Sequence, residues 1–176
     1  MVFAFKILNT NCTPAAGITV EVWHTNCEGL YSGNTAGATY LGPNWNVGNI
    51  CTTNDPMRAP RAKASTWHRG SQVTNSEGEV YFRSCFPGWY TGRTNHVHLR
   101  CSENGRQLFF TQFAWTDELC REIHVNHPEY SGKPQDTPLS GYDPEFGGPN
   151  RGTDMILDVK KLSDGSMLSS KIVTMG

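Results

Sequence analysis

Residues 86–98 of this 176-residue chain, FPGWYTGRTNHVH, hold one tyrosine, one arginine and two histidines within thirteen positions. Alternate side chains of a strand point to the same face, so a strand over residues 95–101 would aim His96 and His98 in one direction. Their Cα atoms would lie roughly 6.5–7 Å apart, and one metal ion can bridge two imidazoles over that span. Tyr90 precedes His96 by six residues, and a bend at Gly92 can fold its phenol back toward the same ion. The stretch therefore predicts a metal centre built on a strand.

Short strand-like runs occur on both sides of this stretch, each bounded by turn-forming residues. The patterns predict strands over residues 2–8, 18–23, 72–74, 79–83, 96–101, 107–113, 155–162 and 167–173. The dipeptide Asn104-Gly105 indicates a tight hairpin, and Thr116 followed by two acids predicts a short helix over residues 117–123. The pattern is typical of an all-β fold, an antiparallel β-sandwich with one short helix and long loops.

Two long segments, residues 31–65 and 127–151, lack clear periodicity and are rich in turn-forming residues. Loops of that length are usually functional or disordered, and the aromatic residues in the first argue against disorder. The length suits a single domain over residues 1–176. Because residues 2–8 already alternate like a strand, we expect that an N-terminal leader or segment is missing before them.

Composition and charge exclude several classes of partner. A formal net charge of −1 gives no electrostatic footprint for nucleic acid, and no apolar run approaches the ~18–20 residues that span a bilayer. The six cysteines form no Cys-x-x-Cys pair, which disfavours a zinc ribbon. An even number of cysteines in a loop-rich chain favours disulfides and a secreted protein, although the sequence cannot choose the pairing. We expect a secreted monomer.

Two other classes of protein fit part of the pattern. His96-x-His98 followed by Glu103 matches a piece of the cupin metal motif, but Asn104-Gly105 places Glu103 at a turn. A secreted β-sandwich binding module could also keep the fold without catalysis. A His-x-His pair on a strand is as often structural as metal-binding. The prediction of a metal site therefore rests on the presence of Tyr90 and Arg93 close to the pair in the sequence.

The sequence resembles the intradiol ring-cleavage dioxygenases. Pro87-Gly88-Trp89-Tyr90, then Arg93, then His96-Val97-His98 looks like the core motif of that family. Residues 20–31 resemble the strand and turn before the first metal tyrosine, residues 74–82 the hairpin before the Pro-Gly-x-Tyr turn, and residues 111–113 the strand after the histidines. The resemblance covers residues 2–113 well and is closest to the small secreted single-domain branch known from fungi and plant-feeding mites.

The resemblance implies a non-haem Fe(III) ion held by two histidines and two tyrosinates. Tyr90, His96 and His98 match the ligand positions directly. Tyr40, followed by Leu-Gly-Pro, resembles the first ligand tyrosine and is the favoured fourth ligand, and Tyr31 is the alternative. A phenol with an ordinary pKa of ~10 ionises at neutral pH only beside a strong Lewis acid, which ferric iron supplies. A tyrosinate displaced by substrate, with Tyr40 the candidate, can take a substrate proton.

The resemblance also assigns residues around the ion. Arg93 matches the arginine that stabilises negative charge on the substrate ring, and Gln112 matches an active-site glutamine. A strict two-residue turn at Asn104-Gly105 pairs Gln112 with Val97 and aims it away from the histidines, whereas a bulged turn pairs it with His98.

The remaining aromatic and histidine residues are expected to line the pocket or to be structural. Tyr31, Trp67 and Trp89 are candidate walls of the substrate pocket. We interpret His24, His68, His124 and His127 as structural or surface residues rather than ligands.

The implied activity is cleavage of a catechol between its two hydroxylated carbons with O₂, which gives a muconate-type diacid. The implied partners are a small aromatic diol and O₂. The sequence does not choose among catechol, protocatechuate and larger phenolics. A missing N-terminal segment would leave the pocket mouth open enough for bulky catechols.

Overall fold

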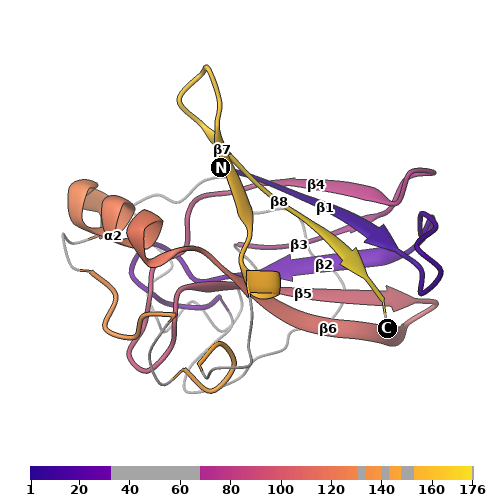
Figure 1. The fold of residues 1–176 in the computed structure, drawn as a ribbon, viewed down its shortest axis with the longest axis horizontal. Helices are drawn as coiled ribbons and strands as arrows, with labels where there is room; N and C mark the ends of the chain where they lie inside the picture. Colours follow the sequence, from indigo (N-terminus) through magenta and orange to yellow (C-terminus); the bar gives the residue numbers. More distant parts are fainter. Residues whose placement is uncertain (33–67, 131–133, 140–142, 148–152, 176) are drawn as a thin grey trace.

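The computed structural model describes residues 1–32, 68–130, 134–139, 143–147 and 153–175. Within them, two four-stranded sheets lie face to face (Figure 1). The first sheet has the strand order β4 (Glu79–Arg83), β1 (Val2–Leu8), β8 (Met167–Thr174) and β7 (Asp158–Lys161). The second has the order β3 (Arg69–Val73), β2 (Thr19–Trp23), β5 (His96–Glu103) and β6 (Arg106–Ala114). The expected all-β sandwich is confirmed.

Three strands differ in detail from the sequence expectation. The strand expected over residues 155–162 is shorter and forms β7 at Asp158–Lys161. The strand pair β1–β8 runs parallel, whereas the other strand pairs of the described residues are antiparallel. The strand expected over residues 72–74 begins earlier, at Arg69. Gly70 has no side chain to signal a strand, and residues 69–73 gain their strand geometry by pairing with β2.

The core lies between the sheets and follows from alternation along the strands. On β1, Phe3, Phe5 and Ile7 are buried while the residues between them are partly exposed. Val22 of β2 and Leu99 of β5 face them from the second sheet within one apolar cluster. Burial of such a side chain stabilises the fold by about 1.5–3 kcal/mol before the entropy of ordering is subtracted.

Strand β5 is buried on both faces, which is why it can carry a site. Val97 and Leu99 enter the core, and by alternation His96 and His98 point to the outer face of the second sheet. Both histidines are nevertheless buried, at 3% and 6% exposure. Loops from other parts of the chain therefore cover the outer face at this point.

The β5–β6 hairpin settles the orientation of Gln112. Asn104 and Gly105 both have positive φ, 49° and 79°, as a tight turn of this type requires. The register then shifts between Cys101 and Ser102, and His98 pairs with Gln112. The register that pairs Gln112 with Val97 is therefore wrong, and the alternative with a bulge, which pairs Gln112 with His98, is confirmed. The one-residue shift turns the Gln112 side chain to the histidine face.

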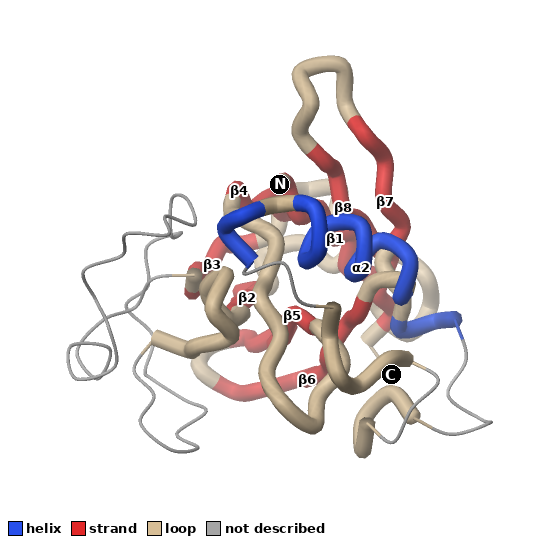
Figure 2. Tube along the Cα trace, turned by 90° about the vertical axis from the view of Figure 1, so that its left-hand side faces the viewer, coloured by secondary structure: helices blue, strands red, loops and turns tan. Residues whose placement is uncertain are grey.

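Helix α2 (Asp117–Asn126) lies across one end of the sandwich (Figure 2). Thr116 caps it by accepting a hydrogen bond from the Leu119 amide, and two acids occupy the first turn. The helix ends later than expected and is followed by two 3₁₀ turns, Pro128–Tyr130 and Thr153–Met155. No helix in the described part of the chain is long and apolar enough to cross a membrane.

The disulfides that the sequence favours do not form at four of the described cysteines. Cys12, Cys85, Cys101 and Cys120 carry free thiols in the structure. Burial raises the pKa of both Cys101 and Cys120 to about 12, so these two behave as small apolar core residues. Cys51 lies outside the described residues.

Candidate metal centre and active site

Tyr31 is placed by a compact turn that follows β2. The Asn26 side-chain oxygen accepts hydrogen bonds from the backbone amides of Glu28 (3.0 Å) and Leu30 (2.9 Å). Gly29 adopts a φ of +79°, and a Cβ there would lie 2.1 Å from the carbonyl oxygen of Trp89. Glycine is thus required both by the backbone conformation and by the close approach of the next loop.

Tyr90 is placed by the Pro-Gly turn, which is fastened to the same structure. The Gly88 amide donates to the carbonyl of Asn26 at 2.8 Å, and the Thr25 hydroxyl donates to the carbonyl of Gly88 at 2.5 Å. The two turns therefore hold Tyr31 and Tyr90 together, with ring centroids 5.8 Å apart and planes at 70°.

The two histidines are oriented in different ways. Nδ1 of His96 lies 2.6 Å from the carbonyl of Thr94, so it carries the proton and leaves Nε2 with a lone pair. The His98 ring instead lies parallel to the indole of its cross-strand neighbour Trp23, at 4.8 Å and 6°. The Nδ1 atom of His98 is buried and has no hydrogen-bond partner in the described structure.

Four donor atoms converge in front of β5. The Tyr31 hydroxyl oxygen lies 2.9 Å from Nε2 of both His96 and His98, and the Tyr90 hydroxyl lies 3.5 Å from Nε2 of His96. One phenol proton cannot serve two acceptor nitrogens at once. A shared cation would satisfy all of these lone pairs, so the donor set fits a metal ion. Two phenol oxygens with two imidazoles suit a hard, highly charged ion such as Fe(III).

The electrostatics of the buried residues agree with that fit. Burial, reinforced by Arg93, lowers the pKa of His96 to about 4, and burial also lowers the pKa of His98, with His96 adding to the effect. Both imidazoles are therefore neutral, as metal ligands must be. Burial, and next the neighbouring Tyr90, raises the pKa of Tyr31 well above its ordinary value. Only a strongly polarising cation would ionise this phenol at neutral pH.

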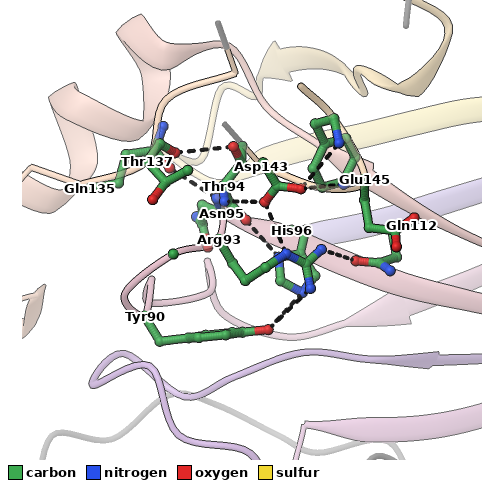
Figure 3. A network of polar contacts seen from close by, with 12 residues as sticks. Tyr90, Arg93, Thr94, Asn95, His96, Gln112, Gln135, Thr137, Asp143 and Glu145 are labelled. Atoms are coloured by element: carbon green, nitrogen blue, oxygen red, sulfur yellow. Dashed lines mark hydrogen bonds and ion pairs between the residues drawn. The ribbon is translucent and has the colours of Figure 1, made fainter. Parts of the chain in front are cut away.

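Arg93 lies beside the convergent atoms and is held by three partners (Figure 3). Its Nε donates to Asp143 at 2.9 Å, one terminal nitrogen donates to the Gln112 side-chain oxygen at 2.6 Å, and the other lies 3.4 Å from the Tyr90 hydroxyl. The guanidinium is thus fixed between a strand and two loops. It supplies a positive charge near the place where a substrate would meet the metal.

Asp143 is the residue that the sequence did not reveal. It is 2% exposed, and it accepts hydrogen bonds from the Thr94 amide (2.6 Å) and, through its other oxygen, from the Glu145 amide (2.7 Å). Burial alone would raise the pKa of this carboxyl, but these amides together with Arg93 lower it. An Asp two residues before a Glu in a Pro/Gly loop is too common a turn signal to identify its role.

The structure brings together most of the residues expected from the sequence. Those found within one site are Tyr31, Tyr90, Arg93, His96, His98 and Gln112. Trp89 is half-buried beside Tyr90 in the chain, and its role as a pocket wall stays a prediction. Tyr40 and Trp67 lie outside the described residues. Trp23 joins the site through its stacking on His98, which the sequence analysis did not foresee.

The cupin alternative fails on geometry. Glu103 is exposed at the far end of β5, next to the turn, and pairs in register with Arg106. Five residues of strand, roughly 17 Å, separate it from His98, so it cannot share an ion with the histidines.

The comparisons with known proteins identify the family of the chain. A family model described as a dioxygenase matches residues 1–125, and the chain belongs to that family. Within it the chain falls among the intradiol ring-cleavage dioxygenases, in a single-domain branch that includes mite proteins. No curated protein matches the chain.

Solved structures extend the likeness over the whole fold. An intradiol ring-cleavage dioxygenase from Tetranychus urticae is 25% identical, with a TM-score of 0.77 over 100% of this chain and 80% of that one. The dioxygenase domain of a carbohydrate-binding fusion from Streptomyces sp. SirexAA-E is 16% identical, with a TM-score of 0.60 over 98% and 77%. A 3-chlorocatechol 1,2-dioxygenase from Rhodococcus opacus 1CP is 14% identical, with a TM-score of 0.57 over 98% and 57%. The last two show the shared fold alone.

Proposed function

We propose that this protein cleaves catechols between their two hydroxylated carbons, using O₂ and one ferric ion. The observation that carries the proposal is the convergence of the Tyr31 hydroxyl with Nε2 of His96 and of His98, at 2.9 Å each. Family membership supports the reaction class. When bound, the ion would coordinate both oxygens of the diol and draw electron density from the ring, and this would make a ring carbon susceptible to attack by O₂.

Tyr31, Tyr90, His96 and His98 are the residues that would hold the ion. Tyr31 contacts both imidazoles, whereas the expected ligand Tyr40 lies outside the described residues. The charge balance supports this set, because two phenolates offset most of the charge of a trivalent ion and reduce the cost of burying it.

Tyr90 is the phenol better placed to move a proton. Its oxygen lies 3.5 Å from His96 Nε2 and 3.4 Å from Arg93, so it is held less closely than Tyr31. A catechol must lose two protons to bind through both oxygens. The Tyr90 oxygen can accept one of these protons when the substrate binds. The nearby positive charge of Arg93 would stabilise the negative charge that this transfer leaves on the substrate.

Arg93 and Gln112 would orient and stabilise the substrate ring. The guanidinium is fixed by Asp143 and Gln112 before substrate binds, so little reorganisation is needed as negative charge develops on the ring. This preorganisation gives the pair a role in the transition state rather than in holding the metal.

The substrate class is a 1,2-dihydroxybenzene, and both catechol-type and protocatechuate-type compounds fit the chemistry of the site. We further propose that the protein acts outside the cell as a monomer. The free thiols of Cys12, Cys85, Cys101 and Cys120 give no support for the location.

The test is the colour, the iron content and the oxygen uptake of the purified protein. We expect one iron per chain, a visible absorption band from phenolate-to-Fe(III) charge transfer, and O₂ uptake on adding catechol. His98→Ala should lose the iron and the uptake. Glu103→Gln, a change at the other end of β5, should keep both. Folded wild-type protein that takes up iron but shows no visible band and consumes no O₂ with any catechol contradicts the proposal.

A further inference from the structure

A second cluster of metal-ligating side chains lies between the two sheets, on the core side of β2. Here a cavity of about 10 Å³ is lined by Phe3, Val22, Gly70 and Phe82 together with His24, His68, Arg69 and Ser84. That volume holds one water or one ion. Phe3, Val22 and Phe82 form the apolar part of its wall, and His24, His68, Arg69 and Ser84 form the polar part.

Three soft or borderline ligand atoms lie close together beside this cavity, two of them from histidines that line it. One ring nitrogen each from His24 and His68 and the Cys85 sulfur all lie within 4.8 Å of one another. Cys85 Sγ lies 4.0 Å from Nδ1 of His68. The two histidines are buried, at 1% and 5% exposure, and Cys85 is partly exposed, so an ion would enter from the cysteine side.

His24 is already prepared to act as a ligand. Its Nδ1 lies 2.7 Å from the carbonyl of Thr25, which places the ring proton there. Nε2 therefore keeps its lone pair, which accepts a hydrogen bond from the Ser84 hydroxyl at 2.8 Å. A backbone carbonyl that fixes the outer nitrogen is the usual second-shell partner of a metal-bound histidine. Burial also keeps this imidazole neutral by lowering its pKa.

We propose that His24, His68 and Cys85 bind one Zn²⁺ ion, with the Ser84 hydroxyl or a water as the fourth ligand. Two imidazoles and a thiolate are a donor set that zinc favours among the divalent ions. As the zinc–sulfur bond forms, the Cys85 thiol releases its proton to solvent.

The site must close slightly around the ion. In a tetrahedral zinc site the ligand atoms lie roughly 3.3–3.6 Å apart. The three ligand atoms lie within 4.8 Å of one another, so no pair needs to approach by more than about 1.5 Å. The imidazoles of His24 and His68 are stacked, 4.9 Å apart at 20°. Binding would require the His68 ring to rotate about its Cβ–Cγ bond so that one nitrogen faces the shared centre. That movement is a side-chain change and leaves the strands in place.

The ion would join the two sheets. His24 follows β2 and His68 precedes β3 in one sheet, whereas Cys85 follows β4 in the other. A zinc ion here is a structural clip between them, in the role that the sequence had suggested for disulfides. It is separate from the catalytic centre, because His24 faces the core and its neighbour Trp23 faces His98 on the opposite side of the sheet.

The experiment titrates the purified, reduced protein with Co²⁺, which replaces zinc and gives a near-ultraviolet thiolate-to-cobalt absorption. We expect this absorption to saturate at one Co²⁺ per chain and to disappear on adding Zn²⁺. Cys85→Ser should abolish it, with at least about a 100-fold loss in zinc affinity. Cys12→Ser, a change at an exposed thiol, and His98→Ala, a change in the catalytic centre, should both retain it.

A second measurement on the wild type removes any dependence on the folding of a variant. Zn²⁺ should slow alkylation of Cys85 at least about 10-fold and leave alkylation of Cys12 unchanged, as read by peptide mass. Absence of the cobalt–thiolate band in folded wild-type protein, its persistence in Cys85→Ser, or equal alkylation of Cys85 with and without zinc overturns the proposal.

Discussion

The hydroxyl oxygen of Tyr31 lies 2.9 Å from Nε2 of His98, although the two residues are 67 positions apart in the chain. The contact joins the turn after β2 to the middle of the second sheet. It places a phenol oxygen within reach of any ion that His98 binds, and it makes Tyr31 the stronger structural candidate for the first tyrosinate.

Replacing each candidate tyrosine separately decides between Tyr31 and Tyr40. Tyr31→Phe should bleach much of the visible charge-transfer band and lower iron content, because a ligand oxygen is lost while the ring is kept. Tyr40→Phe should leave both nearly unchanged. The reverse pattern of absorption and iron content would restore Tyr40 as the ligand.

Gly29→Ala should damage the metal centre without touching a ligand. The new Cβ would meet the Trp89 carbonyl at 2.1 Å, and the φ of +79° strains any residue with a side chain. The turns that carry Tyr31 and Tyr90 must then move apart. We expect a weaker and shifted visible band, together with a loss of roughly 1–3 kcal/mol of stability in urea unfolding. Gly105→Ala is the matched control: it also has positive φ, but a Cβ there meets nothing within 4 Å, so the band should be unchanged.

Trp23 should act as a positioning residue for His98. The indole stacks on the imidazole at 4.8 Å, and Nδ1 of His98 has no hydrogen bond in the described structure to fix the ring. Trp23→Ala should cost about 3–5 kcal/mol of stability, and the surviving folded protein should bind iron more weakly. Trp23→Phe keeps an aromatic face and should rescue iron binding measured by competition with a chelator. Equal iron affinity in the Ala and Phe variants, both folded, would show that the stacking has no positioning role.

Asp143→Asn tests the residue that fixes Arg93. The carboxylate is buried and accepts hydrogen bonds from Arg93 and from the Thr94 amide. Its loss should reduce the free energy of unfolding by about 1–3 kcal/mol. It should also lower kcat while changing KM less. Asp143→Ala, which removes all acceptors, should be worse. Unchanged kcat in the Asn variant, with iron content at the wild-type level, would remove Asp143 from the function of Arg93.

The same variant has a defined pH dependence. The pKa of Asp143 is lowered from its ordinary value of 3.8, so the folded state holds the proton less tightly than the unfolded state. The stabilisation is therefore fully present above pH 3.8 and is lost as the pH falls through the lowered pKa. The difference in unfolding free energy between wild type and Asp143→Asn should be constant well above pH 3.8 and should shrink as the pH falls below 3.8. A difference that persists at the lowest pH would mean that the charge of Asp143 is not what stabilises the site.

Local pattern predicted the parts of the molecule that depend on local geometry. The period of two along a strand was enough to place His96 and His98 on one face, and Asn104-Gly105 was enough to place the hairpin. The register of Gln112 was not accessible in the same way. It depends on a one-residue shift at Cys101–Ser102 that no residue type announces.

The remaining parts depend on contacts between distant segments. The turn that carries Tyr31 is joined to the turn that carries Tyr90 by the hydrogen bond from the Gly88 amide to the Asn26 carbonyl. Asp143 reaches Arg93 across 50 positions of the chain. His24 and His68 looked structural one at a time, and their meeting with Cys85 is visible only in three dimensions. Residues with reactive or metal-binding side chains can therefore be recognised in the sequence more readily than the residues that contact them in the fold.

The most direct test of the catalytic account is the structure of the product formed from unsubstituted catechol by the iron-loaded protein. The account predicts one O₂ consumed per catechol and a muconate-type diacid that has gained both oxygen atoms, identified by mass and NMR. A hydroxymuconic semialdehyde, which arises by cleavage beside rather than between the hydroxylated carbons, would contradict the assignment of the tyrosine–histidine centre. So would unreacted catechol in the presence of fully iron-loaded, folded protein.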